Sequence, residues 1–569
     1  MELLTLLERC QISFGAKADR LRRMLGAGFP VPTAYVISDA DCTAADPDAL
    51  ADEVRELMTT VFSGSPVVVR SSSADEDTPL ASAAGVYESY LNRRTPDEVL
   101  GALRLCRQSA LSADADAYRD MHGATERAPM SVLIQKMVAC ETSGVLYTRN
   151  PVAENATMLV ESSQGLGTKV VAGLGAQDRY TLSRAGGTAS PEPGWTVPEG
   201  GLHTALRTLG LMLEAEFGRP QDVEWGLSEG RLYVFQSRDV VAKRVTPPLR
   251  ATRPETLGAS AAALVISPGY GIGTPVERGN GPALPGQVVV LDAMPTASEL
   301  ANLQDAAALI LRVGNTLSHS AALTRELAIP AVLISGPEAI PGSGGPLLVD
   351  GVNGRVVRLL DLPPVDRKKA IFAAMRHAGL RGTSGHHYQG RYETVLFDPV
   401  LQDRVRWYLR DGGVETVDRV QRILPFDDPD RTYCGISARI QSTADTCRVQ
   451  FKRANLLPDR PFRFDEEVHV HTESEDAGAE LLRGLHYVGR PAQERRIGIA
   501  EVEDVRLQFN SWPGAGQSYL GLESEHPEQV EKFLIACDVP VSECAPLDGK
   551  DLFEMLGLGL DSLRFRGNS

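Results

Sequence analysis

Apolar and polar residues follow two different periods over the first 240 residues of the chain. Helical spacing predicts a helix over residues 19–27, whereas continuous apolar runs predict buried strands ending near residue 37 and at 67–69. Similar segments follow one another without a long gap to about Val241. Strands and helices in alternation predict an α/β domain.

Proline-bearing breaks at residues 246–248, 253–255 and 362–364 divide the chain. A charged helix is expected over 365–378, and the polar stretch 379–390, with its glycines and histidines, is interpreted as a second linker. A chain of 569 residues is also too long for one hydrophobic core. We therefore expect a multidomain α/β and α+β protein with domains at residues 1–245, 255–362 and 388–569.

Charged and apolar residues alternate again on several separate segments of the last third of the chain. Strands are expected near residues 392–397, 435–440, 446–453 and 464–471, with helices over 474–485 and 527–537. Antiparallel strands that carry charges on one face predict a sheet or a barrel-like tunnel with a polar interior. The residues expected in that interior are Arg439, Lys452, Arg495 and Glu523.

Composition narrows the classes of function. The formal charge of −16 argues against nucleic acid and anionic membranes as partners, although small phosphorylated ligands need only a local group of basic residues. The eight cysteines include no CxxC pair, which favours reduced thiols over a zinc site or a disulfide framework. Acidic residues interrupt the apolar N-terminus, so we expect no signal peptide and a cytoplasmic protein.

His319 is the first candidate for chemistry. It follows a glycine-bearing turn and Ser318 or Thr316 as a helix N-cap, and Pro330 ends the short helix. An imidazole is largely neutral and nucleophilic near pH 7, and a phosphoryl group on it would face free N–H groups at the helix start. The segment therefore suits a histidine that carries phosphate, although a capping or buried histidine is an equally good interpretation of these residues alone.

Phosphate-binding chemistry is also predicted in the first 240 residues. Lys17 follows a glycine at a helix start, and Arg70 ends an apolar strand beside three serines. Two later strands, 221–225 and 232–238, would present Glu224 and Gln236 as oxygen ligands for Mg²⁺, with Arg238 near the γ-phosphate. Each residue taken singly is more simply a surface ion pair.

The segment Ser-His-Ser-Ala-Ala-Leu-Thr-Arg-Glu over residues 318–326 resembles the phosphohistidine signature of the pyruvate phosphate dikinase, phosphoenolpyruvate synthase and rifampin phosphotransferase family. Residues 267–273, 286–290 and 349–354 resemble the flanking parts of that family's swivelling β/β/α domain. The resemblance implies that His319 is the catalytic phosphoryl carrier. Leu317 stands where the family more often has a small polar residue.

The first 240 residues resemble the ATP-grasp domain of the same family, for instance at 15–17, 70–72, 135–138, 143–148 and 221–238. Two positions depart from the family pattern, with Asp114 in place of an arginine that reaches the phosphates and Thr168 in place of an acid. The resemblance implies ATP and Mg²⁺ as cofactors, with Glu224 and Gln236 on the metal. The implied ATP-binding residues are Lys17, Arg70, Gln135, Lys136, Met137, Val138, Glu161, Asp222 and Arg238.

The C-terminal pattern resembles the triphosphate-tunnel (CYTH) family, whose tunnel binds triphosphates with basic residues and metals with glutamates. Glu393 matches, but Val395, Phe397, Gln441 and Gly521 replace charged residues of that family. An adapted acceptor-binding tunnel is therefore the interpretation that we adopt. His469 and His471 share a strand face with Glu467 and could bind a metal, although histidines at this spacing more often line a tunnel.

These features predict an ATP-dependent phosphotransferase in which His319 is phosphorylated, with AMP and phosphate as products, and then carries the phosphoryl group to a small anionic acceptor in the C-terminal domain. The breaks at 246–248 and 362–364 would let the middle domain swing. The family's long enzymes end in a pyruvate-binding barrel or a helical drug-binding domain, and neither fits residues 391–569. Two alternatives stay open: a regulatory protein with a disabled ATP domain, and a triphosphate hydrolase.

Overall fold

The computed structural model groups Met1–Asp361 into one compact unit and Leu362–Ser569 into another. The expected linkers at 246–248 and 253–255, as well as Thr168 and Leu317, lie outside the residues that it describes. The described residues are 2–3, 13–44, 47–73, 76, 86–122, 127–152, 157–165, 178–191, 197, 202–240, 261–279, 281–316, 318–334, 340–341, 345–383, 385–427, 436–443, 446–456, 461–485, 487–490, 492–511 and 518–547.

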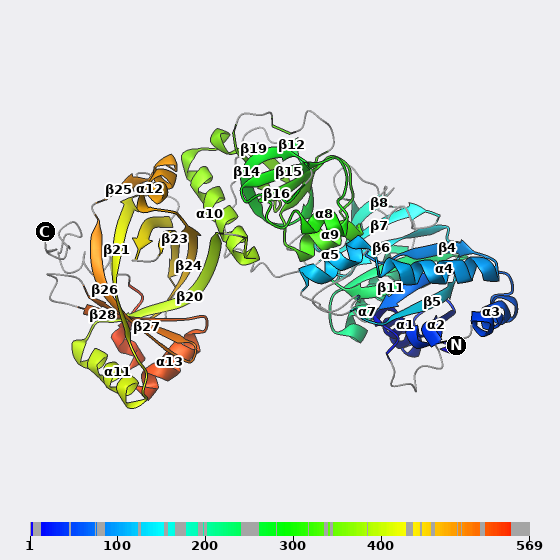
Figure 1. The fold of residues 1–569 in the computed structure, drawn as a ribbon, viewed down its shortest axis with the longest axis horizontal. Helices are drawn as coiled ribbons and strands as arrows, with labels where there is room; N and C mark the ends of the chain where they lie inside the picture. Colours follow the sequence, from blue (N-terminus) through cyan, green and yellow to red (C-terminus); the bar gives the residue numbers. More distant parts are fainter. Residues whose placement is uncertain are drawn as a thin grey trace. The chain divides into compact units, whose positions relative to one another are not determined.

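The first sheet of unit 1 has five strands in the order β1-β2-β5-β3-β4 (Figure 1). Apolar side chains of the strands and of two helices that cover the sheet form one core, which includes Val54, Val69, Leu103 and Ile134. The elements are β1 (Glu2–Leu3), α1 (Ala16–Gly26), β2 (Ala34–Ile37), α2 (Asp39–Ala44), α3 (Pro47–Glu56), η2 (Leu57–Val61), β3 (Val67–Ser73), β4 (Ser89–Arg93), α4 (Pro96–Ser109), α5 (Ala113–Met121) and β5 (Met130–Lys136).

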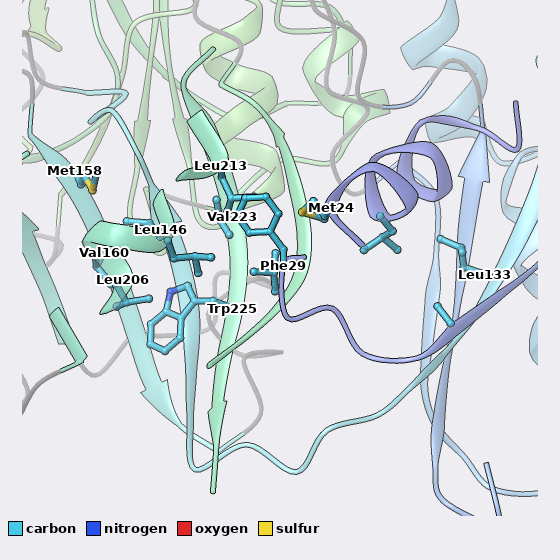
Figure 2. Packing of buried hydrophobic residues seen from close by; sticks show 14 of the residues in the cluster. Met24, Phe29, Leu133, Leu146, Met158, Val160, Leu206, Leu213, Val223 and Trp225 are labelled. Atoms are coloured by element: carbon cyan, nitrogen blue, oxygen red, sulfur yellow. The ribbon is translucent and has the colours of Figure 1, made fainter. Parts of the chain in front are cut away.

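The second sheet of unit 1 has six strands in the order β11-β10-β6-β7-β8-β9, and all its neighbours are antiparallel. One face packs on α1 and α7, where Trp225 is surrounded by Leu146, Val160 and Leu206 (Figure 2). Alternation along the strands leaves the other face free to carry polar residues. The elements are β6 (Thr142–Tyr147), β7 (Met158–Gln164), β8 (Asp178–Leu182), β9 (Ser190–Pro191), α7 (Leu202–Phe217), β10 (Gln221–Ser228) and β11 (Arg231–Asp239).

The third sheet of unit 1 has eight strands in the order β12-β19-β18-β14-β15-β16-β17-β13. Strands β14 to β17 are parallel, and helices lie in the connections from β15 to β16 and from β16 to β17; the second of these helices, α9, begins at His319. The elements are β12 (Ala261–Ala262), β13 (Leu264–Ser267), β14 (Tyr270–Glu277), β15 (Gln287–Leu291), α8 (Ala297–Ala301), β16 (Ala308–Leu311), α9 (His319–Glu326), β17 (Ala331–Leu333), β18 (Leu347–Asp350), β19 (Arg355–Arg358) and η4 (Leu359–Asp361).

Unit 2 is built on one antiparallel sheet in the order β22-β23-β24-β20-β28-β27-β26-β21, and a further β21–β22 pairing closes it on itself. Apolar side chains on its outer face form two cores. The elements are α10 (Pro364–Arg381), β20 (His386–Leu396), α11 (Pro399–Asp411), β21 (Val417–Asp427), β22 (Ile436–Ser442), β23 (Cys447–Leu456), β24 (Arg463–His471), α12 (Glu475–Gly484), β25 (Val488–Gly489), β26 (Gln493–Val502), β27 (Val505–Ser511), β28 (Ser518–Ser524), α13 (Pro527–Ala536), η5 (Val541–Glu543) and β29 (Cys544–Ala545).

The second linker predicted at residues 379–390 is wrong. Helix α10 continues to Arg381, and β20 already pairs with β24 from His386 onward. The helix also packs on the sheet through Arg376, whose Nε lies 2.7 Å from an oxygen of Glu466. Gly382, at a φ of 75°, ends the helix at a tight helix-to-strand turn, whereas Gly379 lies within α10 and Gly390 within β20.

The prediction of a multidomain protein with several mixed α/β sheets is confirmed. Among the described residues, no helix is long and apolar enough to cross a membrane.

Trp225 anchors the core under the second sheet and is 1% exposed. Trp225→Ala should lower the free energy of unfolding by about 3–5 kcal/mol, because the surrounding side chains could not fill the cavity that the indole ring leaves. Trp225→Phe should cost much less, since it keeps most of the ring volume. Denaturant titration of both variants measures the difference, and equal costs would contradict this packing role.

Candidate active site

Helix α1 starts against the end of strand β3, where the sequence predicted phosphate-binding groups. Gly15 has a φ of 90°, and a Cβ there would lie 2.4 Å from the carbonyl oxygen of Ser72, so only glycine allows this approach. Ser72 Oγ accepts the N–H of Ala18 at 3.0 Å, and Lys17 Nζ donates to Ser71 Oγ at 3.2 Å. The two predicted segments therefore meet in space.

Arg70 reaches from β3 to the second sheet. Its guanidinium donates to Glu224 Oε2 at 3.3 Å, to the amide oxygen of Gln236 and to the carbonyl of Phe235 at 3.1 Å. Glu224 and Gln236 are direct partners on β10 and β11, and a register shift follows Glu224. Such irregularities redirect side chains and are common beside active sites.

Direct pairing extends this arrangement into a row across the second sheet. Gln236, Glu224, Val145, Glu161 and Arg179 pair in turn on five neighbouring strands. Partners in an antiparallel ladder project to the same side, so all five share the face opposite the Trp225 core. This row, which we call the sheet row, is the floor of the candidate site.

A second row lies next to it on the same face. Asp222 pairs with Arg238 on one side and with Tyr147 on the other. Arg238 Nε donates to Asp222 Oδ2 at 2.8 Å, which holds the guanidinium against the sheet. The predicted phosphate residue Arg238 is thus positioned by the predicted ATP residue Asp222.

The segment that carries His319 rests on these rows. Thr316 Oγ1 donates to Glu161 Oε1 at 3.2 Å and also contacts the guanidinium of Arg179. Arg325 donates to the carbonyl of Thr316 at 2.6 Å and to the Tyr147 hydroxyl at 3.3 Å. Arg179 and Glu161 have side chains only 2% exposed, so this docking contact excludes water.

His319 is the first residue of α9, and Ser318 is the N-cap, because its hydroxyl accepts the N–H of Ala321 at 3.3 Å. Burial lowers the pKa of His319 to about 3, and the nearby cations Arg238, Lys17 and Arg70 act in the same direction, whereas Glu224 opposes them. The imidazole is therefore neutral, as a nucleophile must be.

Burial alone would raise the pKa of Glu224. The cations Arg70, Arg238 and Lys17 outweigh burial, so the pKa is lowered. Glu224 is therefore an anion at neutral pH. One carboxylate and one amide oxygen side by side fit Mg²⁺, which takes few protein oxygens and completes its shell with phosphate and water.

The predicted ATP-binding residues 135–138 differ in their exposure to solvent. Gln135 is buried on β5, and its Nε2 has no partner among the described residues, which leaves a donor for a ligand. The strand ends at Lys136, which is exposed, and Met137 and Val138 follow it half-buried. The implied ATP-binding segment 135–138 thus extends two residues beyond the end of β5.

Sequence reasoning missed Arg179 and Tyr147 at this site, and it considered Thr316 only as a helix cap. Arg179 belongs to no motif, and its strand follows a segment without periodic signal. Tyr147 lies in a matched segment, 143–148, but its role depends on a residue 178 positions away. The pairing register places Arg179 and Tyr147 on the sheet, and their contacts with Thr316 and Arg325 complete the arrangement.

The interior face of the unit 2 sheet contains an ion-paired group. Lys452 Nζ lies 2.9 Å from Glu393, 2.6 Å from Asp465 and 3.4 Å from Glu467. Arg463 binds Glu393 at 2.7 Å. The predicted interior residue Lys452 therefore neutralises neighbouring acids rather than standing free.

Amide side chains hold the guanidinium groups of three other interior arginines. Arg495 donates to Gln421 at 2.6 Å and to Asn510 at 2.9 Å, Arg448 donates to Gln441 at 3.0 Å, and Arg439 contacts Gln450. Burial, helped by Arg439, lowers the pKa of Arg495 to about 10, and burial lowers the pKa of Arg448. Amides orient these arginines without cancelling their charge, so this group, which we call the amide-held arginines, can receive an anion.

Glu523 and His469 lie on the same interior face. Burial and the carboxylates of Glu393 and Glu467 raise the pKa of Glu523 to about 7. His469 Nε2 lies 3.3 Å from Glu467. Within the described part of the chain, no three His, Cys, Asp or Glu side chains are grouped as a metal site. Metal binding by His469 and His471 stays a prediction.

Two regions of the chain match known protein families. Residues 43–191 match the AMP/ATP-binding domain of pyruvate phosphate dikinase, and residues 284–354 match the mobile domain of PEP-utilising enzymes. The first contains Arg70, Gln135 and Glu161, and the second contains His319.

Curated relatives include the phosphoenolpyruvate synthase of Pyrococcus furiosus, which is 31% identical over 337 residues, 51% of this chain and 41% of that enzyme. The rifampicin phosphotransferase of Streptomyces sviceus is 34% identical over 223 residues, 34% of this chain and 25% of that protein. The chain spans about two fifths of the length of the phosphoenolpyruvate synthases that it matches.

Solved structures give weaker likeness. A conserved hypothetical protein from Pyrococcus furiosus is 16% identical, with a TM-score of 0.23 over 28% of this chain and 97% of that one. A dinucleotide-forming acetyl-coenzyme A synthetase from Korarchaeum cryptofilum gives 14% identity and a TM-score of 0.24 over 41% and 96%. These scores are too low to establish a shared fold.

The environment of His319 has a consequence for pH. Its docked pKa of about 3 lies below the ordinary value of about 6.5, so docking favours the neutral form. Docking should be complete above about pH 6.5 and weaken as the pH falls. NMR titration of the metal-free protein, with His319→Ala to assign the signal, should give an apparent pKa well below 6.5. A value near 6.5 would contradict the buried placement.

Proposed function

We propose that this protein, whose residues 43–191 and 284–354 match the AMP/ATP-binding domain of pyruvate phosphate dikinase and the mobile domain of PEP-utilising enzymes, is an ATP-dependent phosphotransferase that works through a phosphohistidine at His319. The observation that carries the proposal is the convergence of a neutral His319 with Glu224, Arg238, Lys17 and Arg70. The docked segment brings a nucleophile to a phosphate site built from three distant parts of the chain.

In the proposed reaction, a ring nitrogen of His319 bonds to the β-phosphorus of ATP and AMP leaves. Water then removes the terminal phosphate, so the balance is ATP plus water to AMP, phosphate and a singly phosphorylated His319. Arg70, Lys17 and Arg238 stabilise the charge that moves from phosphorus to oxygen. Glu224 and Gln236 hold Mg²⁺, and the orphaned Nε2 of Gln135 donates to the base.

Glu161, which we expected to bind ATP, has a different placement. One of its oxygens accepts from Arg179 and Thr316. Its proposed contribution is therefore to position the segment before His319 at the nucleotide, and any direct contact with ATP would use its other oxygen.

The proposed acceptor is a small anion bound in unit 2. The cations of the ion-paired group around Lys452 bind acids within that group, whereas amide oxygens orient the buried guanidinium of Arg495. Burial makes a guanidinium costly to desolvate, and an anionic ligand would lower that cost. A phosphate- or carboxylate-bearing acceptor would do so.

The relay separates two substrates that could not share one site. His319 would be phosphorylated at the sheet row and would then leave it to transfer the phosphoryl group to the acceptor. The polar groups at Glu161 and Tyr147 suit such a cycle, because water can satisfy their hydrogen bonds once the segment has left.

Radioactive labelling tests the relay directly. Protein incubated with Mg²⁺ and ATP labelled at the β-phosphate should gain acid-labile label. With ATP labelled at the γ-phosphate, the protein should keep no label once the terminal phosphate has been hydrolysed. His319→Ala should gain none. Absence of label on the wild-type protein, with ATP bound, would favour the regulatory alternative instead.

The metal assignment predicts that Glu224→Ala lowers the labelling rate by at least about 100-fold, since one of two protein oxygens for Mg²⁺ is lost. Glu216→Ala, a variant outside the site that loses a pairing with Arg23, serves as the control. Full labelling of Glu224→Ala at saturating Mg²⁺ would exclude the assignment.

The acceptor site can be probed with inorganic tripolyphosphate, in an Arg70→Gln background that weakens the competing phosphate site. Arg439→Gln and Arg495→Gln should each weaken calorimetric binding about tenfold, the size of one charged hydrogen bond. Arg404→Gln, which removes a pair with Asp538 on the outside of the sheet, should not. Equal affinity in all variants would place the acceptor elsewhere.

A further inference from the structure

Helix α5 lies between the two parts of unit 1 that must meet for phosphorylation. It packs beside α8 and approaches α9, the helices of the segment that carries His319 (Figure 1). Ala115 and Tyr118, on one side of α5, are buried in the same apolar cluster as Leu300 and Leu323. The contact is therefore a continuous apolar interface.

Each end of α5 adds a polar contact. Near its start, Asp114 Oδ1 accepts the backbone N–H of Ser298 at 2.8 Å. Just after its end, His122 contacts the buried carboxylate of Glu326 through Nε2. The two residues are eight positions apart, about 12 Å along a helix, so α5 reaches from the start of α8 to the end of α9.

The contact at Asp114 completes a helix cap. In α8, Thr296 accepts the N–H of Glu299, and the Glu299 carboxylate accepts the N–H of Thr296. The N–H of Ser298 belongs to the same first turn and has no acceptor within its helix. Asp114 supplies the missing acceptor from another part of the chain, with a negative charge at the favourable helix end.

We propose that α5 is the docking element for the His319 segment and that Asp114 is its anchoring residue. This inference rests on the proposed phosphohistidine relay. The resemblance placed a phosphate-binding arginine at position 114, and a carboxylate there looked like a defect. The geometry assigns it another task, because its oxygen is used to hold α8.

Asp114 is thus a positioning residue, not a catalytic one. Asp114 affects how often His319 reaches the nucleotide, whereas Lys17, Arg70 and Arg238 bind ATP. Loss of its carboxylate should therefore reduce the rate of phosphorylation without changing the affinity for ATP.

The test compares four variants in the full chain. Asp114→Ala should lower the β-label incorporation rate about tenfold, the size of one charged hydrogen bond, and Asp114→Asn should recover most of it, because the amide oxygen still accepts. Asp116→Ala is the matched control, since Asp116 is on the same helix but pairs with Arg119. Ser298→Ala should be nearly neutral, because the donor is the backbone.

Two further readouts separate docking from chemistry. The dissociation constant for ATP should be unchanged in Asp114→Ala. Hydrogen exchange of residues 113–121, measured without ATP, should accelerate in Asp114→Ala but not in Asp116→Ala, because the docked state covers α5 less often.

Asp114→Arg distinguishes the two interpretations of this position. On our proposal it removes the acceptor, so labelling falls and the affinity for ATP does not rise. Tighter ATP binding with faster labelling would overturn the proposal and restore the phosphate role of this position. Unchanged labelling and hydrogen exchange in Asp114→Ala would also overturn the docking proposal. If the wild-type protein gains no label but the exchange differences appear as expected, the result counts against the phosphohistidine relay alone.

Discussion

The register of the second sheet of unit 1 is the constraint on which the site depends. Direct pairing sets Gln236, Glu224, Val145, Glu161 and Arg179 side by side, although the first and last are 57 positions apart and come from opposite edges of the row. A slip of one residue on any strand would turn its member of the row into the Trp225 core. The residues proposed for the metal, Glu224 and Gln236, and those that contact the His319 segment, Glu161 and Arg179, therefore depend on the packing of the same hydrophobic core.

Charge is handled differently in the two units. Around His319, cations stand against carboxylates and lower the pKa of the imidazole, so the nucleophile is neutral while the phosphates would still meet positive charge. In unit 2, acids neutralise Lys452 and Arg463, but amides hold Arg439, Arg448 and Arg495. Amide partners fix a guanidinium in place and preserve its charge, which is what recognition of an anion requires.

Departures from a family pattern need not be losses. Asp114 replaces an expected arginine, yet its carboxylate completes the cap of α8. Glu161 matches the expected residue, yet it is engaged with Arg179 and Thr316 at the docking contact. In both cases the residue type is compatible with two roles, and the neighbours that fold against it decide between them.

The sequence alone determined what depends on neighbours along the chain. Helical periodicity, the Ser318 cap and the glycine before Lys17 are local, and they predicted the start of α9, the phosphate-side groups and the strands that carry Glu224 and Gln236. The local signal failed at 379–390, because glycine and polar residues suit a tight turn as well as a linker.

Only the tertiary structure decided which residues meet. Arg179 with Thr316, Tyr147 with Arg325 and Asp114 with Ser298 are pairs separated by more than 130 positions, and no pattern along the chain specifies them. The amide-held arginines likewise emerge from the pairing of β21 with β26 and of β22 with β23. The free energy of such contacts comes from excluding water between distant surfaces, and that depends on how whole sheets and helices pack.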